Sequence, residues 1–378
     1  MVFKEYYPRP FFAHNYKIKH ITLVGSWIFM TSQKKQSSSL KHISKIKRLR
    51  KQEPSAKELI KGIVEGDKAH LAKSITLVES SNQKHSKKAN EIIEGCLLSK
   101  TDSIRIGITG VPGVGKSTFI EVFGKMLTGL GKKVAVLAVD PSSTLSKGSI
   151  LGDKTRMELL AKDPKAFIRP SPSSESLGGV ARKTRESIIL CEAAGYNVIL
   201  VETVGVGQSE TVVHGMVDFF LLLKLAGAGD ELQGIKRGIM EMADAVVINK
   251  ADGTNKKEAD KAKLEFKGAL HLYPAKENNW SPKVLTCSAL NNEGIDNVWK
   301  MIEDFIELTK NNTSFDSNRT RQNENWFLET VNDRLYQNFY NDKAVKQKLK
   351  SLLIAIKENK TSPFFAAKKL LELKNNHK

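Results

Sequence analysis

The eight residues Gly110-Val111-Pro112-Gly113-Val114-Gly115-Lys116-Ser117 decide the fold of this 378-residue chain. They follow an apolar run at residues 105–109 and precede a stretch of helical periodicity from Thr118 to Leu130. Glycines followed by a lysine and a hydroxyl residue, between a strand and a helix, are typical of a phosphate-binding loop. The glycines let the backbone aim several N–H groups at one phosphate, and the positive end of the helix adds to that field. We therefore predict a nucleoside triphosphate site.

Three side chains at the end of this loop have predicted roles. Lys116 can reach the β and γ phosphates, and the Ser117 hydroxyl can ligate Mg²⁺. Thr118, the next residue, is also expected to contact the nucleotide.

Seven apolar runs alternate with helical stretches between residues 104 and 309. Runs without polar alternation are typical of strands that helices cover on both faces. We therefore predict an α/β fold with a doubly wound, mostly parallel sheet and a site at the carboxyl ends of its strands. The predicted strands are Ile104–Thr109, Val134–Val139, Phe167–Arg169, Val198–Val201, Phe219–Leu223, Ala245–Ile248 and Val284–Cys287.

Helical regions are predicted on both sides of the sheet. Ser55 begins a capping box and Asp67 can cap a second helix, so a small helical pad precedes the nucleotide domain. Residues 313–325 are polar and rich in turn formers, which predicts a linker. Three helices follow it, and their apolar faces would pack on the core or on a second copy. The predicted parts are a basic tail at 1–53, a helical region at 54–100, a P-loop domain at 101–312 and a helical region at 313–378.

The net charge of +19 is concentrated at the ends of the chain. Residues 1–51 hold 12 Lys and Arg against one acid, and residues 341–378 hold 10 Lys against three acids, which leaves +1 for residues 52–340. A nucleic-acid enzyme more often has a basic stripe on its folded core. We therefore expect no nucleic-acid partner and interpret the ends as solvated tails.

The cysteines and the amino-terminal tail indicate the cellular compartment in which the protein is expected to function. Cys96, Cys191 and Cys287 are isolated, which predicts neither a disulfide framework nor a zinc site and indicates a reducing compartment. No segment reaches the roughly 20 apolar residues that span a bilayer. The tail is poor in acids, as a mitochondrial transit peptide would be, but rich in lysine rather than arginine. We expect a cytoplasmic protein, or a mitochondrial matrix protein if the tail is a transit peptide.

The motif Asn249-Lys250-Ala251-Asp252 follows an apolar run and indicates the base. The Asp252 carboxylate can accept hydrogen bonds from guanine N1–H and from the exocyclic amine. Adenine offers neither donor there, and an unpaired carboxylate costs about 1–3 kcal/mol. Asn249 can pair with the other edge of guanine, and the Lys250 stem can lie along the base plane. The motif therefore favours GTP over ATP.

A second short motif also favours guanine. Ser288-Ala289-Leu290 follows the next predicted strand and resembles the loop whose backbone N–H contacts guanine O6. GTP and GDP are the expected nucleotides.

Two acidic residues end predicted strands and indicate a Mg²⁺ site. Glu202 ends the run VILV in a Walker B arrangement, with Glu where Asp is commoner, and Asp140 ends the run VAVLAV. Mg²⁺ takes few protein ligands, so one carboxylate with Ser117 and two phosphates suffices. These acids at strand ends are therefore interpreted as metal or water positioners.

Two segments that follow these acids are predicted switch loops. Residues 141–153 and 203–208 are small, polar and rich in glycine, and such loops order when a γ phosphate is present. The Gly205 N–H could meet that phosphate. Gln208 is a candidate for orienting the attacking water, but its spacing differs from that of small signalling GTPases, so the water-orienting group stays open.

Several long motifs resemble a single family. They are similar to the MeaB/ArgK-type GTPases, chaperones of methylmalonyl-CoA mutase within the metallochaperone-like group of P-loop GTPases, over about residues 55–375. The motifs are Gly110–Ser117, VDPSS at Val139–Ser143, SILGDKTRM at Ser149–Met157, LGGVARKTRE at Leu177–Glu186, VETVGVGQSE at Val201–Glu210, AGAGDELQGIKRGIMEMAD at Ala226–Asp244 and NKAD at Asn249–Asp252.

The resemblance implies a slow, Mg²⁺-dependent GTPase. Such proteins couple GTP hydrolysis to loading of adenosylcobalamin onto the mutase and to its protection, and they form homodimers through a carboxyl-terminal helical arm. The resemblance places Asp140, Asp153 and Glu202 at the Mg²⁺ and water site with Lys116 and Ser117.

The resemblance also implies a third switch, residues 227–238, that reads the partner. Gln233 and Lys236 are its expected active members, with Lys236 counted among the catalytic residues. Which acyl-CoA mutase is the partner stays open, because methylmalonyl-CoA and isobutyryl-CoA enzymes would present similar surfaces.

Three other functions compete with this one. An ATP-dependent kinase of periplasmic lysine/arginine/ornithine-binding transport proteins is an older label for the family, and Asp252 speaks against ATP. A nickel-insertion GTPase should have a Cys/His cluster near its switches, where only Cys191 and His214 are found. A ribosome-associated GTPase would have a basic core, and this core is nearly neutral.

Overall fold

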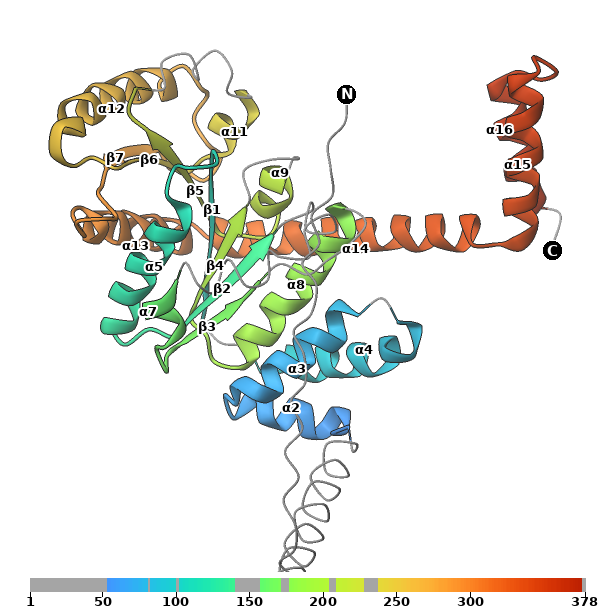
Figure 1. The fold of residues 1–378 in the computed structure, drawn as a ribbon, viewed down its shortest axis with the longest axis horizontal. Coiled ribbons are helices and arrows are strands. Elements are labelled where there is room, and N and C mark those ends of the chain that lie inside the picture. The colour runs from blue at the N-terminus through green and yellow to red at the C-terminus, as the bar shows by residue number, and fades with distance from the viewer. Residues whose placement is uncertain are drawn as a thin grey trace, which may run out of the picture. The chain divides into compact units, whose positions relative to one another are not determined.

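A seven-stranded parallel sheet forms the centre of the computed structural model (Figure 1). The strand order is β3-β2-β4-β1-β5-β6-β7, so β1 lies in the middle, β4 lies between β1 and β2, and β5 to β7 follow on the other side. This confirms the predicted doubly wound fold, and each predicted strand end agrees with the structure to within two residues. The strands are β1 Ile104–Gly110, β2 Val134–Val139, β3 Ala166–Arg169, β4 Val198–Thr203, β5 Phe219–Leu225, β6 Ala245–Asn249 and β7 Lys283–Thr286.

The structure describes residues 53–80, 82–99, 102–139, 157–170, 177–203, 209–227 and 237–375. Residues 56–378 form one compact unit. Its described helices are α2 Ala56–Val64, α3 Lys68–Glu79, α4 Gln83–Leu97, α5 Lys116–Gly129, α7 Glu158–Ala161, α8 Leu177–Ala193, α9 Ser209–His214, α11 Arg237–Met242, α12 Lys256–Leu270, α13 Ile295–Asn311, α14 Ser314–Tyr340, α15 Lys343–Lys357 and α16 Pro363–Asn375, with a short 3₁₀ turn at Gly253–Asn255.

Alternate residues of each strand face two different hydrophobic cores. On one face of β2, Val136 packs in a core with Phe123 of α5 and Ile302 of α13. On the other face, Ala135 packs in a core with Ile188 of α8 and with the amino-terminal helices. Because both faces are covered, the strands need no polar alternation, and this is why they appear in the sequence as continuous apolar runs.

The amino-terminal helices begin as the sequence predicts. Asp67 caps α3, because its Oδ1 accepts hydrogen bonds from the backbone N–H groups of Ala69 and His70 at 2.7 and 2.8 Å. Glu79 at the end of α3 forms an ion pair with Arg169 of β3. The pad formed by α2–α4 is therefore attached to the sheet by a salt bridge as well as by apolar packing.

The segment predicted as a linker, residues 313–325, is helical, so that prediction is wrong. It forms the first half of α14, in which Phe315 and Gln322 are buried. The prediction failed because polarity was interpreted as a sign of a loop. The polar side chains Arg319 and Gln322 instead form hydrogen bonds with groups about 100 residues or more earlier in the chain.

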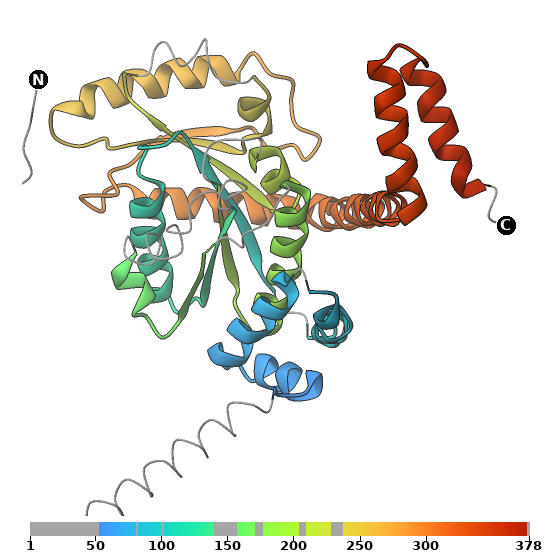
Figure 2. The same ribbon diagram turned by 45° about the vertical axis from the view of Figure 1, so that its right-hand side comes forward.

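Helices α15 and α16 form an antiparallel pair (Figure 2). Ser362 caps α16, since its Oγ accepts a hydrogen bond from Phe365 N at 3.2 Å. A small core of Val345, Leu352, Ala366 and Leu370 holds the pair together. Across the described residues, no helix combines the length and the apolarity needed to cross a membrane.

All three cysteines are buried and free. Burial raises the pKa of Cys96 to about 11 and the pKa of Cys287 to about 12, and it also raises the pKa of Cys191. The three residues therefore behave as small core side chains.

Candidate active site

The phosphate-binding loop connects β1 to α5 at the carboxyl edge of the sheet. Gly110, Gly113 and Gly115 have φ values of 153°, 84° and 92°. A Cβ at Gly110 would lie 2.6 Å from the carbonyl oxygen of Leu223, and one at Gly115 would lie 2.8 Å from Asn249 Nδ2. Two of the loop glycines are therefore required both by backbone conformation and by space.

Lys116 is buried and lies across its own loop. Its Nζ donates hydrogen bonds to the carbonyl oxygens of Gly110 at 2.7 Å and Val111 at 3.2 Å. Burial lowers the pKa of Lys116, while the charges of Glu202 and Glu210 raise it. An ammonium group held in this way is a strong point charge beside the loop amides.

The carboxyl end of β4 brings a carboxylate beside the loop. Ser117 Oγ and Glu202 Oε1 are 3.4 Å apart, at the limit of a hydrogen bond. Nearby, Thr203 Oγ1 donates to Thr109 Oγ1 at 2.8 Å, which joins the ends of β4 and β1. A hydroxyl and a carboxylate oxygen therefore face each other where the helix begins.

Asn249 joins the base motif to the phosphate loop. Its Nδ2 donates to the carbonyl oxygen of Val114 at 2.9 Å, and its Oδ1 accepts from the backbone N–H of Ala289 at 3.2 Å. Lys250 Nζ donates to the carbonyl oxygen of Gly113 at 2.9 Å. Since these side chains come from the end of β6 and the loop follows β1, the two motifs are held in one arrangement.

The Asp252 carboxylate is oriented by Ser288, which follows β7. Ser288 Oγ donates to Asp252 Oδ2 at 2.5 Å, and the same Oγ accepts from the backbone N–H of Asn291 at 3.1 Å. Ser288 thus fixes the orientation of the Asp252 carboxylate, the group predicted from the sequence to bind guanine.

Comparison with known proteins gives the family. Residues 71–344 match the family described as "Methylmalonyl Co-A mutase-associated GTPase MeaB". The chain belongs to the MeaB family. It is therefore a GTPase, with a guanine-nucleotide site and a P-loop α/β fold.

Individual members of the MeaB family show how far the likeness extends. The "GTPase ArgK" of Escherichia coli (strain K12) is 44% identical over 320 residues, which cover 85% of this chain and 97% of that protein. The "Methylmalonic aciduria type A homolog, mitochondrial" of Mus musculus is 43% identical over 330 residues, covering 84% and 80%. The crystal structure of a protein named "LAO/AO transport system kinase" is 38% identical, with a TM-score of 0.68 and coverage of 85% of this chain and 98% of that chain.

The described part of this MeaB-family chain contains most of the predicted site. The loop residues, Ser117, Glu202 and the base motif gather at one edge of the sheet, whereas the side chain of Leu290 is 80% exposed. Within the described ranges, no group of three or more His, Cys, Asp or Glu side chains gathers as a metal site would. The predicted residues Asp140, Asp153, Gly205, Gln208, Gln233 and Lys236 lie outside the described residues.

Three side chains near the site were not assigned a role from the sequence. Glu210, in the first turn of α9, is only 6% exposed, and its charge acts on Lys116. Thr109 and Thr203 join the two strand ends. Glu210 was visible in the motif VETVGVGQSE, but nothing in that motif indicates that its side chain is buried near the lysine.

Proposed function

We propose that this protein is a Mg²⁺-dependent GTPase that acts as a chaperone of a cobalamin-dependent acyl-CoA mutase, coupling GTP hydrolysis to adenosylcobalamin loading and to protection of methylmalonyl-CoA mutase. The observation that carries the proposal is the family match over residues 71–344, which names the mutase as the associated protein. The name of the mouse relative, which refers to methylmalonic aciduria, supports the same partner.

In this proposal the phosphate loop holds GTP and stabilises the transition state. Lys116 leaves the carbonyl oxygens of Gly110 and Val111 to meet the β and γ phosphates, and the loop amides donate to the same oxygens. Donors fixed in advance stabilise charge without reorganising during the reaction. Little covalent chemistry is needed from the protein in phosphoryl transfer, so positioning and charge supply most of the rate.

The residues present fit a Mg²⁺ ion. Ser117 Oγ and Glu202 Oε1 are both hard oxygen donors, and their 3.4 Å separation points them at one place beside the loop. Mg²⁺ prefers such ligands together with phosphate oxygens and water. Ser117 and Glu202 would hold the ion, with Asp140 and Asp153 as further proposed ligands. When bound, the ion would neutralise phosphate charge.

Guanine recognition is assigned to Asn249, Lys250, Asp252 and the backbone of Ser288 and Ala289. Asp252 is held by the 2.5 Å bond from Ser288, so its second oxygen can face the donor edge of guanine. Leu290 is proposed to complete the loop without a side-chain contact.

The partner and the dimer are assigned to two other regions. Gln233 and Lys236 in the third switch are proposed to respond to the mutase, which would raise a slow intrinsic rate. Homodimer formation is assigned to the carboxyl-terminal helices, which leave large apolar side chains exposed. These exposed residues are Phe327, Leu328, Val331, Leu335, Tyr336, Leu353, Ile354, Phe364, Phe365 and Leu371.

An ATP-dependent kinase of periplasmic amino-acid-binding transport proteins is the second candidate. The 38% identical crystal structure supports it, since that protein is named a transport system kinase. Asp252 distinguishes the two functions, because adenine has no donor pair for its carboxylate. The GTPase is therefore favoured on the chemistry of the base site.

The test is nucleotide hydrolysis by the purified protein with GTP or ATP, with and without methylmalonyl-CoA mutase. Lys116→Ala serves as the control for contaminating phosphatases. We expect GTP-selective turnover that the mutase accelerates. GTP turnover that is indifferent to the mutase would overturn this partner and leave the GTPase, whereas a preference for ATP with phosphate transfer to a transport protein would overturn the proposal.

A further inference from the structure

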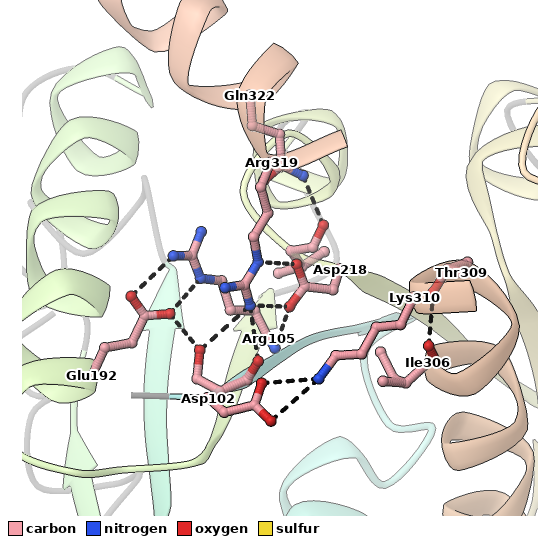
Figure 3. Close-up of polar contacts among 11 residues, drawn as sticks. Asp102, Arg105, Glu192, Asp218, Ile306, Thr309, Lys310, Arg319 and Gln322 are labelled. Atoms are coloured by element: carbon pink, nitrogen blue, oxygen red, sulfur yellow. Dashed lines mark hydrogen bonds and ion pairs between the residues drawn. The ribbon is translucent and has the colours of Figure 1, made fainter. Parts of the chain in front are cut away.

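A cluster of ion pairs at the amino-terminal edge of the sheet joins segments far apart in sequence (Figure 3). We define the Arg319 cluster as Ser103, Arg105, Glu192, Asp218 and Arg319. Arg319 Nε and Nη2 donate to Asp218 Oδ1 and Oδ2 at 2.8 and 2.7 Å. Arg105 Nε and Nη2 donate to Glu192 Oε1 and Oε2 at 2.8 and 3.0 Å. The cluster therefore consists of two bidentate pairs, the charge-assisted geometry that is most directional.

Backbone groups connect the two pairs. Arg319 Nη2 donates to the carbonyl oxygen of Ser103 at 2.9 Å, and Ser103 Oγ donates to Glu192 Oε1 at 2.6 Å. The backbone N–H of Arg105 donates to Asp218 Oδ2 at 2.8 Å, and the backbone N–H of Asp218 donates to the carbonyl oxygen of Arg105 at 2.8 Å. The side chain of Asp218 is 1% exposed, so its charge depends on these partners. A displacement of Arg319 must therefore also displace the first residues of β1 and β5.

Three elements lead from this cluster to the proposed nucleotide site at the opposite edge. Strand β1 begins at the cluster and ends at Gly110, a span from Arg105 of about 16 Å. Strand β5 begins directly after Asp218 and ends at Leu225, shortly before the proposed third switch. Helix α8 begins at the nucleotide edge and has Glu192 in its last turn. Packed strands and helices of this kind transmit displacement because the interior is dense.

Helix α14 carries Arg319 and is therefore attached to this cluster. Gln322, one turn later, donates through Nε2 to the carbonyl oxygen of Val217 at 2.8 Å, a second attachment beside Asp218. Beyond it, α14 is joined to α8 by an ion pair between Glu329 Oε2 and Arg185 Nη1 at 2.5 Å. Among the described residues, Gln322 Oε1, Trp326 Nε1 and Arg185 Nε are buried without a hydrogen-bond partner. Buried polar atoms without partners are rare. Two of these atoms lie on α14 and one lies on α8, so α14 carries buried polar groups that a different position of the helix could satisfy.

We propose that Arg319 is a positioning residue for GTP hydrolysis, which couples the position of α14 to the phosphate loop through Asp218 and the starts of β1 and β5. The inference rests on the proposed nucleotide site and adds a control point at the opposite edge of the sheet. Coupling between two sites is reciprocal. A nucleotide bound at the loop must therefore change the stability of α14, and a protein bound to α14 must change nucleotide affinity by the same factor.

The first test is amide hydrogen exchange on the full-length protein, alone, with GDP and with a non-hydrolysable GTP analogue. We expect protection of residues 110–130 by either nucleotide. We also expect exchange at residues 315–330 to differ by about fivefold or more between the two nucleotides. Absence of protection at 110–130 would overturn the proposed nucleotide site itself. Protection there without any change at 315–330 would overturn only the coupling.

The second test compares Arg319→Gln with Arg321→Gln. Arg321 lies on the same helix and is 62% exposed, and its contacts are a 3.6 Å ion pair with Glu277 and an exposed 3.1 Å hydrogen bond to Asn318 Oδ1, so its loss should have little effect. For Arg319→Gln we expect kcat for GTP hydrolysis to fall about tenfold while the GTP Kd changes less than about threefold. These values correspond to lost positioning rather than lost binding.

Arg319→Lys keeps the charge but not the bidentate geometry, and we expect it to restore part of kcat. A merely structural role would lower the melting temperature of Arg319→Gln without changing kcat per folded molecule, and that result would overturn the proposal. If Arg319→Gln does not fold, Arg319→Lys and the exchange experiment on the unaltered chain still test the proposed coupling.

Discussion

Asn249 Nδ2 donates a 2.9 Å hydrogen bond to the carbonyl oxygen of Val114, which joins the proposed base site to the phosphate loop across 135 residues. Its Oδ1 accepts from the backbone N–H of Ala289. Asn249→Ala removes both bonds and leaves buried backbone groups unpaired, so we expect GTP affinity to fall by about 1–3 kcal/mol, about 5- to 150-fold. Titration with a fluorescent GTP analogue measures this, and the exposed Asn291→Ala is the control. Equal affinities for the two variants would contradict the assigned role.

Gly115 provides a steric test of the loop. Its φ is 92°, and a Cβ would meet Asn249 Nδ2 at 2.8 Å. Gly115→Ala should therefore abolish nucleotide binding and lower the free energy of unfolding by about 1–3 kcal/mol. Gly129→Ala at the end of α5 has nothing within 4 Å of the added Cβ. We expect that control to bind normally and to be neutral or more stable by up to about 1 kcal/mol. Calorimetry and denaturant unfolding separate the two effects.

Asp252 is expected to set the choice of base. Xanthine has a carbonyl where guanine has its exocyclic amine, so an amide at position 252 could donate where the carboxylate accepted. We expect Asp252→Asn to weaken GTP binding by about 1–3 kcal/mol and to strengthen XTP binding. Competition between GTP, XTP and ATP measures the order, with the exposed Asp296→Asn as the control. A parallel loss of all three nucleotides would point to misfolding of the loop and not to base recognition.

The sequence predicts the sheet well because each strand is an apolar run buried on both faces, as in VAVLAV at 134–139. It also predicts the phosphate loop and the base motif, since local backbone requirements fix glycines and side-chain types at close spacing. It does not predict the first half of α14, which has no apolar period. Arg319 and Gln322 are held there by Asp218 and Val217, and such long-range polar contacts leave no local pattern.

The same limit applies inside the site. Asp252 and Ser288 were each assigned from their motifs, but the bond between them joins two loops that only the parallel pairing of β6 and β7 brings together. Burial of Glu210 beside the lysine likewise depends on how α9 packs after β4. Residue types were therefore predictable, whereas their partners required the fold.

The apolar face at the end of α14 predicts a change in oligomeric state. Leu335 is 62% exposed on a helix that also exposes Phe327, Leu328 and Tyr336. A charge placed in a buried interface costs several kcal/mol, so we expect Leu335→Asp to shift the protein from dimer to monomer. Light scattering during gel filtration measures the mass, and the exposed neighbour Gln337→Asp is the control. A monomeric unaltered protein, or a dimer unaffected by Leu335→Asp, would contradict the assigned interface.

Glu186 on α8 predicts how stability depends on pH. Burial raises the pKa of this carboxyl to about 7, although the charges of Arg182, Lys183 and Arg334 oppose the shift. Its side chain is 15% exposed. Because the folded-state pKa lies above the usual value of 4.5, the folded protein binds this proton more tightly than the unfolded chain. Its contribution to stability is therefore fully present below pH 4.5 and is lost as the pH rises to 7.

Glu186→Gln should remove this dependence. The variant has a neutral group at every pH, so we expect it to exceed the unaltered protein in free energy of unfolding at pH 8, by at most about 3 kcal/mol. The difference should vanish near pH 4.5. Urea unfolding at pH 4.5, 6 and 8 measures it. Glu158→Gln, which is 65% exposed, is the control and should stay within about 0.5 kcal/mol at each pH. A Glu186→Gln variant that is less stable at pH 8 would mean that the carboxylate is held by its arginine neighbours more strongly than burial opposes it.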